Sequence, residues 1–279
     1  MTVWTILKVL QWTAEHFQKH GIPSARIDAE LLMSHSLGIP RIKLYTDFEK
    51  ILNPDELAAI RELVQRRAKH EPVAYILGEK EFYSEKFKVG PGVLIPRPET
   101  ELIIDEVKKL NPSGSLRLLD MGTGSGCLAV VIKKLFPGLD VTASDISDKA
   151  LELAKENAEK ILGPGSVAFV KSALFEGIEG KFDIIVSNPP YIPEGTRLDR
   201  TVGEFEPAEA LFAGPDGLAF YRPFLEKARD FLEPSGRAIL ELGIETGKPV
   251  EGLIDPVKFD ARFVDDLNRI RRLAVLTAK

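Results

Sequence analysis

Hydrophobic residues in the first 72 positions recur at the spacing of amphipathic helices. Three such runs are separated by Gly21-Ile22-Pro23 and Gly38-Ile39-Pro40, and the third ends before Pro72. Ser24 is expected to cap the second helix, and Asn53 opens the third. The apolar faces are expected to contain Val3, Ile6, Leu7, Leu10 and Phe17, then Ile27, Leu31, Leu32 and Leu37, then Leu57, Ile60, Leu63 and Val64. Residues 1–72 are therefore expected to form a helical-bundle domain, a kind of module that serves recognition more often than catalysis.

Residues 73–98 have a different pattern. Short β-prone runs at Glu81–Tyr83, Phe87–Val89 and Val93–Ile95 are separated by turn residues. This segment is expected to be a β-hairpin linker.

From residue 99 to residue 279 the pattern alternates between helix and strand, which indicates a second domain. Apolar strands are expected at 116–121, 140–144, 167–170, 182–187 and 237–242, with helices at 99–110, 127–136, 147–161 and 218–232. The stretches 257–264 and 273–277 are expected to close the sheet as a strand pair. Because strands with nearly continuous apolar runs are buried on both faces, the pattern is typical of an α/β fold with a parallel sheet.

Composition and charge narrow the class of protein. The 279 residues are 44% hydrophobic and 28% charged, as in ordinary globular proteins. The sequence contains no run of 18 apolar residues, so a membrane-spanning helix is not expected. The N-terminus has no secretory pattern, and the single cysteine, Cys127, allows no intramolecular disulfide and no multi-cysteine metal site. We expect a cytoplasmic protein without a metal. The net charge of −5 and the lack of a Lys/Arg run argue against binding duplex nucleic acid.

The first candidate for chemistry is the loop Gly122-Thr123-Gly124-Ser125-Gly126, between a predicted strand and a predicted helix. Glycines there let the backbone turn sharply and approach a ligand closely. A dinucleotide-binding fingerprint needs its third glycine at position 127, where Cys127 stands, so NAD is disfavoured. The tighter spacing suits a nucleoside ligand without a pyrophosphate, such as S-adenosylmethionine. The alternative is an ordinary turn between strand and helix.

The second candidate is Asp145, at the end of the next predicted strand and 19 residues past Gly126. A carboxylate in that position can accept hydrogen bonds from both ribose hydroxyls of a nucleoside. On its own it could equally be a carboxylate at a helix N-terminus beside Ser147. Together with the glycine loop, it favours ribose binding.

The third candidate, Asn188-Pro189-Pro190-Tyr191, directly follows the predicted strand at 182–187. The two prolines have a fixed φ and lack an N–H, so the segment is rigid and leaves carbonyl oxygens without local donors. Asn188 adds a side-chain acceptor and Tyr191 a flat ring. This set suits a planar –NH2 group, whose hydrogens two acceptors would hold. The alternative is a stiff turn with a buried tyrosine.

These three features resemble methyltransferases that act on amino groups, and longer motifs narrow the resemblance to the peptide chain release factor glutamine methyltransferases (the HemK/PrmC family). The motifs span about residues 70–245. They are Tyr75-Ile76-Leu77-Gly78, Phe82-Tyr83, Val93 to Glu101, Glu206-Pro207 with Ala210-Leu211, Gly214 to Leu218, Tyr221, and Leu240-Glu241-Leu242-Gly243.

The resemblance implies a seven-stranded, Rossmann-like class I methyltransferase sheet preceded by the helical domain. It implies that Gly122 to Gly126, Asp145 and Asn188 hold S-adenosylmethionine, that S-adenosylhomocysteine is the product, and that Asn188, Pro189, Pro190 and Tyr191 bind the substrate glutamine and form the catalytic segment. Arg97 and Glu99 would lie near the mouth of the site and contact substrate; an equally good interpretation is a brace between domains in which Arg97 pairs with a carboxylate. The partner would be a class-1 release factor, methylated at N5 of the glutamine in its Gly-Gly-Gln motif, and the enzyme a monomer.

Two positions depart from the family pattern. Ala173 stands where relatives often carry an aspartate near the adenine, so that contact must come from elsewhere, and Thr246 stands where relatives usually have glutamine. Neither position is expected to touch the methyl-accepting site.

Several alternatives remain open at this point. A glutamine of a ribosomal protein would fit the same amide-binding segment, and so would the exocyclic amine of a flipped adenine. The near-neutral helical domain argues against the adenine, and the intact glycine loop argues against a non-catalytic binding module.

Three further candidate residues have ordinary explanations. His16 and His20 are expected to lie on a solvated helix face and Cys127 to pack under the glycine loop, while Asp183, at a strand start, is expected to be structural.

Overall fold

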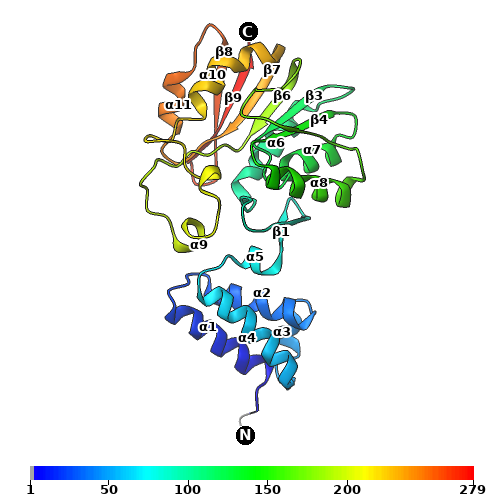
Figure 1. Cartoon of the computed structure of the whole chain (residues 1–279), viewed down its shortest axis with the longest axis vertical. Helices are drawn as coiled ribbons and strands as arrows, with labels where there is room; N and C mark the ends of the chain where they lie inside the picture. The colour runs from blue at the N-terminus through cyan, green and yellow to red at the C-terminus, as the bar shows by residue number, and fades with distance from the viewer. Residues whose placement is uncertain (1–2) are drawn as a thin grey trace. The chain divides into compact units, whose positions relative to one another are not determined.

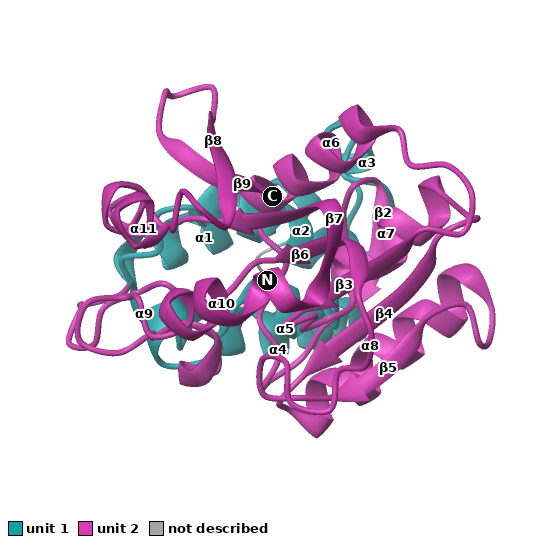
Figure 2. Ribbon diagram, turned by 90° about the horizontal axis from the view of Figure 1, so that it is seen from above, with its two compact units in different colours: residues 1–79, 199–205 teal, residues 80–198, 206–279 magenta. Residues whose placement is uncertain are grey.

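The computed structural model describes residues 3–279, which form two units (Figures 1 and 2). Unit 1 contains the chain up to Glu79 together with Asp199–Phe205, and unit 2 contains Lys80–Leu198 and Glu206–Lys279. The short segment around α9 (Arg200–Gly203) therefore belongs to the same unit as the N-terminal helices.

Unit 1 is a helical bundle, as predicted. Its N-terminal helices are α1 (Ile6–Lys19), α2 (Ala25–Leu37), α3 (Lys43–Thr46), α4 (Pro54–Ala68) and α5 (Val73–Leu77). Asn53 begins α4 as predicted, since its side chain accepts a hydrogen bond from the Glu56 N–H while the Glu56 carboxylate accepts one from the Asn53 N–H.

Ser24 lies at the N-cap of α2 as predicted, although its hydroxyl donates to the Asp28 carboxylate at 2.8 Å instead of accepting a backbone N–H. Two residues of the predicted apolar faces are wrong. Val3 and Ile27 are 49% and 53% exposed, because Val3 precedes α1 and Ile27 lies away from the apolar core. The buried apolar face of α2 is instead Ala25, Ala29, Leu32 and Met33.

A buried ion pair joins the parts of unit 1. The Arg67 Nε donates to the Asp28 Oδ2 at 2.7 Å, and both side chains are less than a tenth exposed. The Arg67 Nη1 also donates to the Glu71 carbonyl and to the Thr201 hydroxyl, each at 3.2 Å. This guanidinium therefore binds α2 and the α9 segment to the end of α4.

The predicted hairpin is shorter than the segment assigned to it. It consists of β1 (Glu79–Phe82) and β2 (Glu85–Lys88), and Val93–Ile95 is not a strand. The Ile95 N–H instead donates to the Glu206 carboxylate at 3.1 Å, so a distant side chain takes the place of a strand partner.

Unit 2 contains the predicted seven-stranded sheet, in the order β5-β4-β3-β6-β7-β9-β8. The strands from β3 to β7 are parallel, whereas β9 is antiparallel to β7 and β8, so the predicted closing strand pair is confirmed. The bounds are β3 (Arg117–Met121), β4 (Asp140–Asp145), β5 (Ala168–Lys171), β6 (Phe182–Ser187), β7 (Leu232–Glu241), β8 (Phe259–Asp265) and β9 (Arg271–Ala278).

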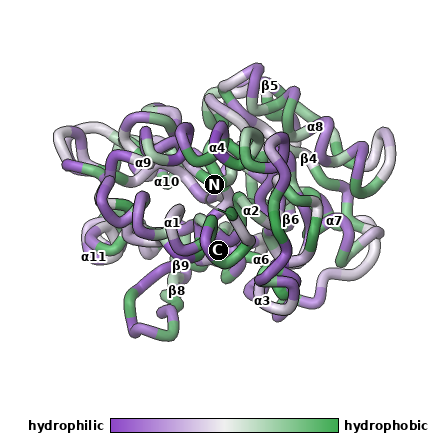
Figure 3. Tube along the Cα trace, turned by 90° about the horizontal axis from the view of Figure 1, so that it is seen from below, coloured by the Kyte–Doolittle hydropathy of each residue, from purple (hydrophilic) through white to green (hydrophobic). Residues whose placement is uncertain are grey.

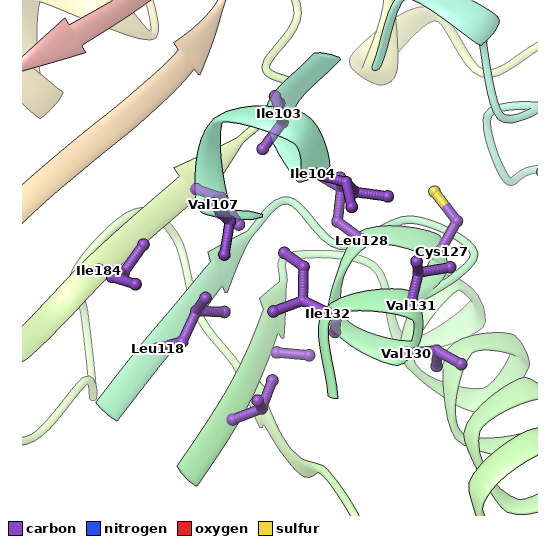
Figure 4. Close-up of a cluster of buried hydrophobic side chains, with 14 of the residues drawn as sticks. Ile103, Ile104, Val107, Leu118, Cys127, Leu128, Val130, Val131, Ile132 and Ile184 are labelled. Atoms are coloured by element: carbon purple, nitrogen blue, oxygen red, sulfur yellow. The ribbon is translucent and has the colours of Figure 1, made fainter. Parts of the chain in front are cut away.

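Helices cover both faces of this sheet. Leu118 packs with the helices α6 (Glu101–Leu110), α7 (Cys127–Leu135) and α8 (Asp148–Leu162) in the apolar cluster that Figure 4 shows in part. The next residue, Leu119, packs on the other face, in the cluster that contains α10 (Tyr221–Lys227) and α11 (Gly247–Leu253). The turn between β8 and β9 is mostly hydrophilic (Figure 3).

Two helices of unit 2 differ from the sequence prediction. The helix expected over 218–232 is α10 followed by a 3-10 turn (Ala228–Phe231), because Leu232 already begins β7. The helix α11 was not predicted, since two glycines and a proline in seven residues give no helical pattern.

We predict that Asp28→Asn lowers the free energy of unfolding of unit 1 by about 3 kcal/mol, because it leaves the Arg67 guanidinium buried without its counter-charge. Both tryptophans, Trp4 and Trp12, lie in this unit, so their fluorescence during urea unfolding reports on it. The matched control is Asp47→Asn at the exposed Lys43 pair, which should change stability by less than about 1 kcal/mol. Equal midpoints for the two variants would contradict a structural role for the buried pair.

Candidate active site

A cavity of about 820 Å³ lies at the carboxyl ends of the central strands of unit 2. The strand order reverses between β3 and β6, and ligands of open α/β sheets bind at such a reversal. Of the predicted site residues, the cavity wall contains Gly122, Thr123, Gly124, Ser125, Asp145, Asn188 and Pro190. Those that are not part of the wall are Gly126, Pro189, Tyr191, Arg97 and Glu99.

The glycine loop turns directly after β3. The N–H groups of Gly122 and Thr123 donate to the Ser144 carbonyl of β4 at 2.8 and 2.9 Å. At Gly126 the φ angle is +82°, and a Cβ there would lie 3.0 Å from the Ala154 Cβ and 3.1 Å from its Cα. Both facts require glycine, because α7 begins at this point against the backbone of α8.

Asp120 lies behind the glycine loop and was not predicted as a site residue. Its Oδ2 accepts hydrogen bonds from the Thr123 hydroxyl at 2.6 Å and from the Ala129 N–H at 3.1 Å. Its Oδ1 and the Ser125 hydroxyl are buried and have no hydrogen-bond partner among the residues described. Burial raises the pKa of the Asp120 carboxyl to about 7. The sequence signal was an acidic residue at a buried strand position directly before the loop.

Asp145 ends β4 and holds the neighbouring backbone. Its Oδ2 accepts the Gly124 N–H and its Oδ1 accepts the Ser147 N–H, both at 2.9 Å. Each carboxylate oxygen can accept a second hydrogen bond. Burial raises the pKa of this carboxyl above its ordinary value. Asp145 therefore makes the contacts of a helix N-terminal carboxylate and still faces the cavity with acceptor capacity.

Asn188 follows β6 and is held from behind by two buried side chains. Its Nδ2 donates to the Thr100 Oγ1 at 2.9 Å, and the Thr100 hydroxyl donates to the Glu241 Oε2 at 2.6 Å. Thr100 and Glu241 are 2% and 1% exposed. Burial raises the pKa of the Glu241 carboxyl to about 7, and the negative charge of Glu99 acts in the same direction. Thr100 and Glu241 occur in the family motifs, but no sequence pattern indicates that these residues, 141 positions apart, are in contact.

Tyr191 packs beside the same carboxylate. Its hydroxyl donates to the Glu241 Oε1 at 3.4 Å, and burial keeps the pKa of the phenol well above its ordinary value. A Cβ at Gly243 would lie 2.7 Å from the Tyr191 Cδ2, and one at Gly217 would lie 2.5 Å from the Tyr191 carbonyl oxygen. Two glycines therefore leave the space in which this ring and its backbone sit.

Arg97 directly precedes the 3-10 turn Pro98–Thr100, and Glu99 lies within it. The Arg97 Nη2 pairs with the Glu206 Oε1 at 2.5 Å, and the Glu206 side chain is 1% exposed. Arg97 therefore does have a carboxylate partner, and the two residues belong to the same unit. Glu99 is exposed.

The remaining candidates have structural roles. Cys127 is buried, which raises the pKa of its thiol to about 12 and keeps it protonated, and the Asp183 carboxylate accepts the Arg117 N–H at 2.8 Å. The rings of His16 and His20 lie 4.3 Å apart, and the His20 Nδ1 contacts the His16 carbonyl. Within residues 3–279 no cluster of His, Cys, Asp or Glu could hold a metal ion.

Comparisons with known proteins agree with this architecture. The family described as PrmC N-terminal domain matches residues 8–78, and the methyltransferase small domain matches residues 98–208. A release factor glutamine methyltransferase of Geobacter sulfurreducens is 44% identical over 275 residues, which cover 97% of this chain and 96% of that protein. One from Rhodopirellula baltica is 44% identical over 250 residues, covering 86% and 84%. The crystal structure of a methyltransferase from Pyrococcus furiosus, 23% identical, superposes with a TM-score of 0.53 over 71% of this chain and 91% of that one, and confirms the class I methyltransferase fold.

We predict that Gly126→Ala lowers the free energy of unfolding by about 1–3 kcal/mol, because the new Cβ meets the α8 backbone and the residue must keep a positive φ. Scanning calorimetry of the full chain measures this as a lower melting temperature. Gly252→Ala in α11 is the matched control, since its Cβ would meet nothing within 4 Å, and it should leave stability unchanged or raise it by up to about 1 kcal/mol. An unaltered melting temperature for Gly126→Ala would show that the loop relaxes without cost.

Proposed function

The chain belongs to the release factor glutamine methyltransferase family, and we propose that it transfers a methyl group from S-adenosylmethionine to a glutamine of class-1 peptide chain release factors. The acceptor is the side-chain amide nitrogen, N5, of the glutamine in the Gly-Gly-Gln motif. The observation that carries the proposal is the orientation of Asn188. The Asn188 Nδ2 donates a hydrogen bond to the Thr100 hydroxyl oxygen. The Asn188 Oδ1 is therefore left to accept a hydrogen bond from the substrate amide at the cavity wall.

The residues around the cavity fit S-adenosylmethionine. The Gly122–Gly126 loop offers backbone close to a ligand, and Asp145 keeps acceptor capacity for ribose hydroxyls. The Ser125 hydroxyl on the cavity wall has no partner among the described residues and can bind a polar amino acid moiety, while the Asp120 carboxyl behind the loop, when ionised, adds a negative charge near a cationic one. Ala173, Leu174 and Phe220 all line the cavity, so apolar contacts are available to an adenine where an aspartate is missing. When bound, S-adenosylmethionine supplies an electrophilic sulfonium methyl group and leaves as S-adenosylhomocysteine.

The chain's own residues hold the acceptor amide. A carboxamide nitrogen is a poor nucleophile because its lone pair is delocalised into the carbonyl. We assign the Asn188 Oδ1 and the Pro189 carbonyl as acceptors for its two N–H groups, which favours a more tetrahedral nitrogen. The two prolines make this segment rigid before the substrate arrives, so positioning and preorganisation supply most of the acceleration.

No general base is assigned. The acceptor nitrogen loses its proton after it has been methylated, when that proton is far more acidic than in the free amide. The buried carboxyls of Asp120 and Glu241 accept hydrogen bonds from the hydroxyls of Thr123 and Thr100, respectively, and neither carboxyl lies on the cavity wall.

The helical unit supports a protein substrate over a nucleic acid. Residues 8–78 match the PrmC N-terminal domain, and the chain carries a net charge of −5. An adenine substrate would require a phosphate-binding basic surface. A ribosomal protein glutamine is the second candidate acceptor, since the same amide-binding segment would hold it. In residues 3–279 no helix is long and apolar enough to span a membrane. We propose a monomer that acts in the cytoplasm, where release factors occur.

Transfer of labelled methyl from S-adenosylmethionine to a purified class-1 release factor tests the proposal. The release factor should be labelled, whereas its Gly-Gly-Gln→Gly-Gly-Ala variant should not. If neither protein is labelled although calorimetry demonstrates cofactor binding, the proposal is contradicted. A glutamine of a ribosomal protein would then be the favoured acceptor.

We predict that Asn188→Ala lowers turnover by about 100-fold or more, since it removes an oriented polar group from the reacting amide. Initial rates of methyl transfer measure this. The exposed Asn268, in the turn between β8 and β9, provides the matched control, and Asn268→Ala should retain wild-type turnover. Wild-type turnover in Asn188→Ala would exclude the amide-binding role.

A further inference from the structure

Three polar side chains from separate parts of unit 2 form one hydrogen-bonded network that runs from the cavity wall into the core. Asn188 follows β6, Thr100 precedes α6, and Glu241 ends β7. The Asn188 Nδ2, Thr100 Oγ1 and Glu241 Oε2 are linked by hydrogen bonds of 2.9 and 2.6 Å. Thr100 lies on the cavity wall next to Asn188, whereas Glu241 is buried behind it.

The chemistry of these groups fixes which of them donates and which accepts in each hydrogen bond. An ionised carboxylate can only accept, so the single hydrogen of the Thr100 hydroxyl points to Glu241. The Thr100 oxygen is then an acceptor, and the only donor of the Asn188 side chain is its –NH2 group. Because the oxygen and nitrogen of an amide have nearly the same shape, such a network decides which of the two faces the cavity.

We propose that Thr100 and Glu241 are positioning residues that hold the Asn188 amide in the one orientation that presents its oxygen to the substrate amide. This inference rests on the proposed function and extends it to residues that do not touch the acceptor nitrogen. The reversed orientation would present –NH2 to –NH2, which offers the substrate no acceptor.

Glu241 also holds the other end of the same segment. Its second oxygen, Oε1, accepts a hydrogen bond from the Tyr191 hydroxyl at 3.4 Å, and its backbone carbonyl accepts one from the Tyr221 hydroxyl at 2.6 Å. One carboxylate therefore fixes Asn188 through Thr100 and Tyr191 directly, while Tyr221 fixes the end of β7 that carries it.

Protonation of Glu241 removes the fixed donor-to-acceptor direction of these hydrogen bonds. A protonated carboxyl can donate to the Thr100 oxygen, and the Thr100 hydrogen is then free to point to the Asn188 amide. The charged groups that act on Glu241 are Glu99, which disfavours its ionisation, and Arg272, which favours it. The hydroxyls of Tyr191 and Tyr221 remain neutral because burial raises the pKa of both phenols. Since the pKa of Glu241 is raised to about 7, kcat should rise with pH through that range.

The first test substitutes Thr100. Thr100→Val keeps the shape of the side chain and removes the hydroxyl, so kcat should fall about 10- to 100-fold, the effect of losing a group that orients a site residue. The KM for the release factor should change by less than about threefold, because ground-state docking is retained. Thr100→Ser restores the hydroxyl and should restore most of kcat. The affinity for S-adenosylmethionine, measured by calorimetry, should be the same in all three proteins.

A loss of kcat that Thr100→Ser does not restore, or an equal loss of cofactor affinity, would show that Thr100 has only a packing role. Thr100 makes no side-chain cap to α6, so Thr100→Val removes no helix cap, and the melting temperature checks its folding. Wild-type protein that fails to methylate the release factor would overturn the proposed function. Active wild-type protein with an equally active Thr100→Val would overturn this inference alone.

The second test is the pH profile of Glu241→Gln. A glutamine cannot ionise in this range, so the rise of kcat near pH 7 should be lost and kcat should be lower at pH 8. Asp120 also has a pKa of about 7, so the profile is measured at saturating S-adenosylmethionine, where an effect on cofactor binding is suppressed. A Glu241→Gln profile that keeps the wild-type rise would overturn the role of this carboxylate.

Discussion

Parallel strands end at the same edge of their sheet, and the site depends on this constraint. The strands β4, β3, β6 and β7 are neighbours in that order, and each delivers one part of the site where it ends. These parts are Asp145, Gly122–Ser125 and Asn188 on the cavity wall, and Glu241 buried behind it. Residues separated by long stretches of sequence meet there because their strands are hydrogen-bonded neighbours. Backbone groups beyond a strand end also lose their partners in the sheet, so they bind side chains such as Asp145 or remain available to a ligand.

Three of the buried carboxylates of unit 2, Glu206, Asp120 and Glu241, show how differently the burial of a carboxylate is compensated. Glu206 is held by a guanidinium and a backbone N–H, so its charge is matched within the fold. Asp120 and Glu241 receive only neutral donors, and burial therefore raises the pKa of both carboxyls to about 7. The ion-paired Glu206 stabilises the structure. Asp120 and Glu241 instead titrate near neutral pH, and each accepts a hydrogen bond from a threonine of the cavity wall, Thr123 and Thr100 respectively.

Features that depend on neighbouring residues could be predicted from the sequence, and features that depend on distant ones could not. The strand at 182–187 and the cap at Asn53 were predicted correctly, because an apolar run and a capping pattern are local. Val93–Ile95 was predicted as β-prone, but its backbone is bound by Glu206, more than a hundred residues away. Gly122 to Ser125, Asp145 and Asn188 lie on the cavity wall, and the sequence could indicate them because each follows a predicted strand. The partners Thr100 and Glu241 could not, since only the packed sheet brings them together.

The segment Asp199–Phe205 has a consequence for the order in which the chain is completed during synthesis. A ribosome releases α1 to α5 first, but Thr201, which accepts from Arg67, follows 134 residues later. By then β3 to β6 and Asn188 have already been made. The helical unit therefore gains its last segment only after much of the sheet exists, so no single cut of the chain separates a whole unit 1 from a whole unit 2.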